Sequence, residues 1–169
     1  MKHRTQVALL LLFLLTTAVA LPTIPSAEAA GTDWAAEIQA MDAALERGDV
    51  ATAQAAWREA YAAAHAGRGW PGMVAVGAAA IRLGRATDTV AVAESRARRV
   101  YLTALFRARR HGSLDGVLAA GEAFGRLGDR EMVQQALAMA TDMAKRSGDD
   151  LAQRRVQAFR SQWVARPLT

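Results

Sequence analysis

Two stretches of equal length, Gly72–Gly84 (GMVAVGAAAIRLG) and Gly116–Gly128 (GVLAAGEAFGRLG), decide the fold of this chain. Placed over each other at an offset of 44 residues, they agree at seven of thirteen positions, and only two of the seven are Ala. Three of the identities are Gly, a residue that suits places where helices start, pack closely or stop. Such self-similarity at a fixed offset predicts a repeat architecture.

Gly residues divide the rest of the chain into Ala-rich segments of helical length. Apolar residues nowhere alternate with the period of two that a half-buried strand requires. Helix starts and stops marked by Asp, Ser, Pro and Gly predict seven helices joined by tight turns. Their expected ranges are about 33–47, 50–66, 70–84, 88–111, 113–127, 129–147 and 149–164.

The intervals between successive turns indicate how these helices are grouped. Gly48, Gly84 and Gly128 are 36 and 44 residues apart, the range in which helix-hairpin solenoids repeat. The final helix instead carries a single apolar stripe, with Arg residues outside it, which suits the end of a stack. We predict an all-α fold: a short α-solenoid of about three antiparallel helical hairpins plus a C-terminal capping helix. The stripe consists of Ala152, Val156, Phe159 and Trp163.

The spacing of small and aromatic residues around the turns gives a family resemblance. After Gly48-Asp49 come Ala53, Trp57 and Ala60, and after Gly128-Asp129 come Val133, Leu137 and Ala140. With Gly121 and Phe124 ahead of the second turn, this pattern resembles the tetratricopeptide repeat (TPR) family over residues 33 to 147. The Pro that ends the family's units is absent here, and the middle unit lacks a clean second-helix pattern. The resemblance implies a TPR-like helical repeat whose first helices line a concave, partner-binding surface.

The N-terminal segment has the features of an export signal. Lys2, His3 and Arg4 precede an apolar stretch, Val7 to Ala20, which is shorter than the roughly 20 residues a spanning helix needs. Ala27-Glu28-Ala29 supplies small residues where a signal peptidase requires them. We therefore predict a cleavable signal peptide over residues 1–29 and a periplasmic or secreted domain over 30–169, with an uncleaved N-terminal anchor as the alternative.

Composition argues against most catalytic chemistry. The chain has no Cys and 3 His, so thiol nucleophiles, iron–sulfur clusters and His-rich metal sites are not expected, and neither is a cofactor. His111, Ser113 and Asp115 have the composition of a hydrolytic triad, but helix capping explains their types at a turn. The net charge of +5 is mild, and RNA-binding motifs are missing. We predict neither an enzyme nor a nucleic-acid-binding protein.

Wheel positions on the first helices define a candidate partner-binding surface that mixes aliphatic and charged groups. A peptide could lay aliphatic side chains against the Ile and Leu residues while Arg82 and Arg126 pair with its carboxylates. The alternative is that the same residues only pack neighbouring hairpins together. The predicted surface consists of Ile38, Asp42, Leu45, Val74, Ile81, Arg82, Leu118, Glu122 and Arg126.

One further feature is a row of basic residues on the fourth predicted helix. Arg96, Arg99, Arg107 and Arg110 fall within about 80° on a helical wheel of roughly 100° per residue. A row of Arg could bind anionic lipid or polymer, which would make the protein an envelope-associated one; the alternative is a solvated face that keeps an Ala-rich protein soluble. The partner expected first is nevertheless a protein or peptide on the concave face.

Overall fold

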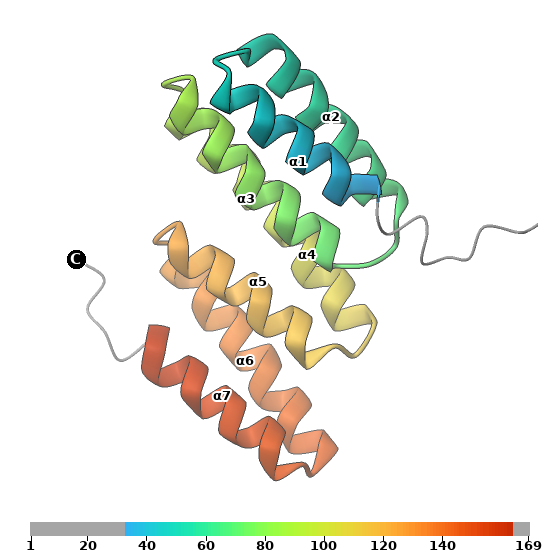
Figure 1. Cartoon of the computed structure of the whole chain (residues 1–169). Helices are drawn as coiled ribbons and strands as arrows, with labels where there is room; N and C mark the ends of the chain where they lie inside the picture. The colour runs from blue at the N-terminus through green and yellow to red at the C-terminus, as the bar shows by residue number, and fades with distance from the viewer. Residues whose placement is uncertain (1–32, 164–169) are drawn as a thin grey trace, which may run out of the picture.

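The computed structural model describes residues 33–163, and all regular structure in that range is α-helical (Figure 1). The predicted all-α fold is confirmed. Turns of two to four residues join the helices. The helices of the described range are α1 (Asp33–Glu46), α2 (Val50–Ala66), α3 (Pro71–Ala86), α4 (Val90–Arg110), α5 (Leu114–Arg126), α6 (Arg130–Ser147) and α7 (Asp150–Trp163).

Consecutive helices pair into three hairpins, α1–α2, α3–α4 and α5–α6, and α7 packs against the last of them. The most extensive contacts lie within the hairpins, and the main contacts between hairpins join neighbours along the stack. The odd-numbered helices also contact one another in succession, α1 with α3, α3 with α5 and α5 with α7. The predicted helical repeat with a terminal helix is therefore present, and its odd-numbered helices share one face.

The turn inside each hairpin has the same backbone geometry. Gly48, Asp88 and Gly128 are spaced by 40 residues and adopt positive φ angles of 73°, 53° and 74°. In each turn the next backbone N–H donates to the carbonyl five residues earlier, with N···O distances of 2.9, 2.8 and 3.0 Å. Measured at the turns, the repeat is a regular 40 residues. The predicted intervals of 36 and 44 were wrong because Gly84 is not a turn residue.

Gly84 lies inside α3, which continues to Ala86. A Cβ atom on Gly84 would overlap the side chain of Ala93, so this Gly lets α3 and α4 approach closely. A Gly inside a helix can thus mark a packing site as well as a helix end. The prediction that the third helix ends at Gly84 was wrong because this Gly was interpreted as a helix end. Asp88 has the left-handed turn conformation instead.

The 44-residue offset does describe how successive hairpins join. The ring of Trp34 lies on Gly72 beside Ala64, and the ring of Trp70 lies on Gly116 beside Ala108. A Cβ on Gly72 would come within 3.0 Å of the Trp34 indole nitrogen, and one on Gly116 within 2.8 Å of the Trp70 ring. The same aromatic joint is therefore built twice, once at the start of α3 and once at the start of α5.

Side chains buried between the helices form two hydrophobic clusters. The smaller one joins α1, α2 and α3 around Met41, Trp57 and Leu83. The larger one runs from the end of α2 to α7 and includes Tyr101, which meets the ring of Phe124 edge-on at 5.8 Å. Burial is the main cause that raises the pKa of Tyr101. Ala152, Val156 and Phe159 are buried on α7, as its apolar stripe predicted.

Candidate functional site

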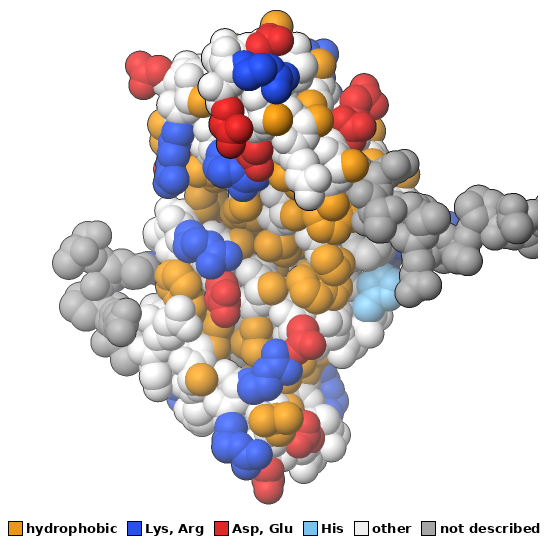
Figure 2. All heavy atoms as spheres, viewed as in Figure 1, with side chains coloured by type: hydrophobic (Ala, Val, Ile, Leu, Met, Phe, Trp, Pro, Cys, Tyr) orange, Lys and Arg blue, Asp and Glu red, His pale blue; other side chains and the backbone are white. Residues whose placement is uncertain are grey.

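The odd-numbered helices present one continuous face, which we call the front face because it faces the viewer in Figures 1 and 2. Figure 2 shows apolar side chains gathered along the middle of this face, with acidic and basic side chains around them. Four aliphatic residues of the predicted partner surface are half-buried, and each packs against one or both of the hydrophobic clusters. They are Ile38, Leu45, Val74 and Ile81.

The charged residues predicted for this surface are already paired with one another. Arg82 on α3 makes a two-pronged ion pair with Asp42 on α1, with N···O distances of 3.0 and 2.9 Å. Arg126 lies 3.8 Å from Glu122, one turn earlier on α5. All four side chains are partly exposed, and exposed pairs of this kind are worth only about 0–1 kcal/mol. A carboxylate from a partner could therefore replace Asp42 or Glu122 in these ion pairs at little cost in free energy.

A hollow of about 450 Å³ lies at the α5–α7 end of the front face. Leu118, Ala119 and Phe159 line it with apolar surface, the Trp70 ring forms another wall, and Asp115 forms an ion pair with Arg155 beside it. We call this hollow the front pocket. Leu118 and Glu122 were predicted to lie on this surface, but the contribution of α7 was not predicted, because α7 was expected only to cap the stack.

The structure corrects the expected exposure of Leu118, since this side chain is only 7% exposed and belongs to the core. An acidic substitution at Leu118 would bury a charge and unfold the chain, because an unpaired buried charge is strongly unfavourable. Ala158 also lines the front pocket and is exposed, so it can be changed without disturbing the core.

The four Arg residues predicted to form a row on α4 differ in their surroundings. Arg99 and Arg110 are exposed, whereas Arg96 and Arg107 are half-buried. The Arg96 guanidinium lies over the Trp57 ring, 4.8 Å from its centroid. The row is therefore not a uniformly solvated strip, because two of its members contact α2 or the segment that follows it.

Arg107 connects α4 to the end of α2. Its guanidinium donates hydrogen bonds to four backbone carbonyls, at 2.9 Å for Ala64, 2.8 Å for His65 and 3.1 Å for Gly69, with Gly67 as the fourth. Burial is the main cause that lowers the pKa of Arg107. Helix ends leave carbonyls without partners, and this side chain satisfies them where the chain leaves α2.

The three residues with triad composition are each engaged elsewhere. The His111 Nε2 atom lies 3.2 Å from the carbonyl oxygen of Arg68, and the Ser113 hydroxyl accepts a hydrogen bond from the backbone N–H of Gly116 at 3.1 Å. Asp115 pairs with Arg155. Capping and inter-helix contacts account for all three side chains.

No protein-family model, curated protein or solved structure matches this chain. Within residues 33–163, none of the helices combines the length and apolar character needed to cross a bilayer. The same range contains no group of three or more His, Asp or Glu side chains arranged to hold a metal ion. The predicted signal peptide, residues 1–29, lies outside the described residues.

Proposed function

We propose that this protein is an exported, TPR-like adaptor that binds an extended peptide or protein segment across its front face. The observation that carries the proposal is the band of apolar side chains along the middle of this face, together with the front pocket between α5 and α7. Direct contacts between odd-numbered helices support placing this face on the inside of the stack. Solenoids characteristically bind partners along such a surface.

The chemistry of the face suggests what a partner segment would carry. Apolar side chains would rest against Ile38, Val74 and Ile81, and a bulky one would enter the front pocket beside Trp70. Exposed ion pairs along the path, such as Arg82 with Asp42, offer either sign of charge to the partner. Because exposed pairs are weak, they would fix the orientation of the segment more than its affinity.

A peptide library displayed on phage tests this proposal directly. The domain covering residues 30–169 serves as bait, and we expect it to enrich peptides with aromatic or branched aliphatic residues. Ala158→Glu places an exposed carboxylate at the mouth of the front pocket and should reduce binding at least tenfold. Ala62→Glu, at an exposed position of α2, is the matched control and should bind normally.

Circular dichroism spectra and urea midpoints establish that both variants remain folded. Enrichment of the same peptides by wild type and by Ala158→Glu with equal affinity would refute binding at the front pocket. Failure to enrich any peptide family would refute the proposed recognition of linear segments.

A further inference from the structure

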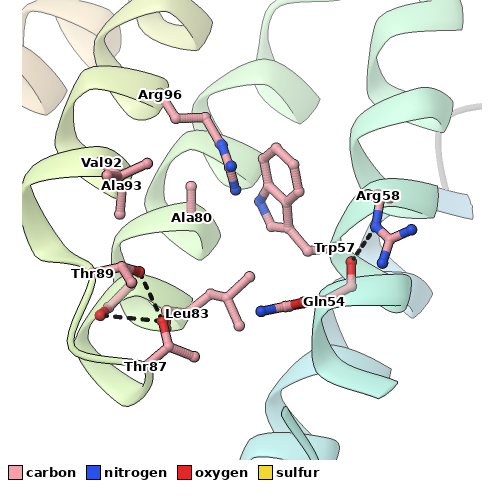
Figure 3. Close-up of a pocket in the computed structure, with 11 residues that line it drawn as sticks. Gln54, Trp57, Arg58, Ala80, Leu83, Thr87, Thr89, Val92, Ala93 and Arg96 are labelled. Carbon is pink, nitrogen blue, oxygen red and sulfur yellow. Dashed lines mark hydrogen bonds between the residues drawn. The ribbon is translucent and has the colours of Figure 1, made fainter. Parts of the chain in front are cut away.

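The side of the molecule formed by the even-numbered helices has a pocket of its own, between α2 and the α3–α4 hairpin. Its volume is about 420 Å³, which lies within the range of small-molecule sites. We call it the back pocket, and Figure 3 shows the side chains that line it. Its lining includes Trp57 and Arg58 of α2, Leu83 of α3, and Ala93 and Arg96 of α4.

The polar groups around the back pocket include two cations and no carboxylate. Arg58 comes from α2 and Arg96 from α4, and neither forms an ion pair with a described residue. The Arg58 Nε donates to the carbonyl of Gln54 at 3.2 Å, and the Thr87 hydroxyl donates to that of Leu83 at 2.9 Å. Positive charge with unused N–H donors therefore borders a cavity that contains no compensating negative charge.

The apolar part of the back pocket's lining is anchored by Trp57. Trp57 is only 7% exposed, and its indole N–H donates to the carbonyl of Val76 at 3.0 Å, which fixes the ring against α3. Leu83 and Ala93 close the opposite side. Arg96 extends from α4 toward the Trp57 ring, as Figure 3 shows. Contact with the ring restrains the guanidinium, so less rotamer freedom is lost when it binds an anion.

From this arrangement we infer that the back pocket binds a small organic carboxylate with an apolar body. The carboxylate is held by the guanidinium of Arg96 or Arg58, a donor whose planar fork matches two carboxylate oxygens. The aromatic or aliphatic body lies against Trp57, Leu83 and Ala93. This site is on a different face from the proposed peptide surface, so the two can be tested separately.

The probes are three acids, 4-phenylbutyrate, indole-3-propionate and octanoate, with 4-phenylbutanamide and inorganic phosphate as comparisons. Titrations followed by ¹H–¹⁵N NMR report on the indole N–H of Trp57 and the Nε–H of Arg96. We expect at least one acid to shift both signals with a dissociation constant of about 1 mM or lower, as ligand efficiency allows for about twelve heavy atoms. The amide, which lacks the charge, should bind about tenfold more weakly than its parent acid.

Arg96→Gln and Arg58→Gln test the two cations, and at least one of them should weaken binding of that acid about three- to tenfold. Arg99→Gln is the matched control, because Arg99 is exposed on the same helix and does not line the pocket. Three results would each overturn the proposal: no shift with any acid at 10 mM, equal affinity for acid and amide, or unchanged affinity in both pocket variants. If phosphate bound as tightly as the acids, the proposed contribution of the apolar body to binding would be refuted.

Discussion

Replacing Arg107 with Met should destabilise the fold far more than its charge alone suggests. The side chain of Met replaces the apolar stem of Arg but cannot donate to the four carbonyls at the end of α2. A hydrogen bond from a charged donor is worth about 1.5–3 kcal/mol. Because one partly exposed guanidinium serves four acceptors, some of which water can reach, we expect a net loss of about 2–3 kcal/mol rather than the sum.

Urea denaturation followed by circular dichroism measures this loss. With a slope of about 1–3 kcal/mol per molar urea, the midpoint should fall by about 1–2 M. Arg107→Lys keeps the charge but replaces the planar fork with a compact ammonium, so it should give an intermediate value.

Arg110→Met is the matched control for this measurement, because Arg110 lies nearly one turn further along α4 and is exposed. Its effect should stay within about 0.5 kcal/mol. If Arg107→Met changed the free energy of unfolding no more than Arg110→Met does, water would be an equal partner for the four carbonyls, and the structural role assigned to Arg107 would be refuted.

Three other predictions follow from the turns and the termini. Asp88→Gly should stabilise the fold by about 0.5–1 kcal/mol in a thermal or urea titration, because Asp88 has the left-handed backbone conformation that Gly adopts at Gly48 and Gly128; an unchanged midpoint would contradict it. Hydrogen bonds from the Thr52 side chain, which is the larger cause, and from the Thr52 backbone lower the pKa of Asp49. The ionised cap therefore stabilises the fold fully at pH values above the ordinary pKa of Asp, and this stabilisation is lost as the pH falls through the lowered pKa. Carboxyl ¹³C NMR should give a low midpoint for Asp49 that rises in Thr52→Ala, and an unmoved midpoint would exclude the hydroxyl. Protein recovered from a native envelope or secreted fraction should begin at Ala30 by mass spectrometry, whereas an intact N-terminus would favour the anchor.

Most of the helical architecture could be predicted from the sequence because its signals are local. Asp49 and Asp129 cap α2 and α6 through their side chains, and Gly48 and Gly128 adopt left-handed turns. At these helix ends the apolar pattern, the capping residue and the turn residue all indicate the same boundary, so the boundary could be predicted. At Gly84 the same residue type had a different cause, close packing against Ala93, which only the neighbouring helix reveals.

The candidate sites depended on contacts between hairpins, and these were harder to foresee. A helical wheel places Arg96 and Arg107 on one face, but Trp57 and the end of α2 lie 39 or more residues away in sequence. Asp42 and Arg82 were assigned to one surface without being recognised as a pair. Their separation of 40 residues equals the turn-to-turn repeat, a signal that could have placed them side by side.

The division of the interior into two clusters affects how the molecule opens. The main contacts between hairpins join neighbours, so stability is added unit by unit along the stack, and a terminal unit can detach while the others stay folded. Amide hydrogens of α1 and α2 should therefore exchange through a partial opening that leaves the part of the larger cluster between α3 and α7 packed. A segment bound across several hairpins would have to dissociate before any one of them could open. Whether the domain unfolds as a single unit would then depend on whether a partner is bound.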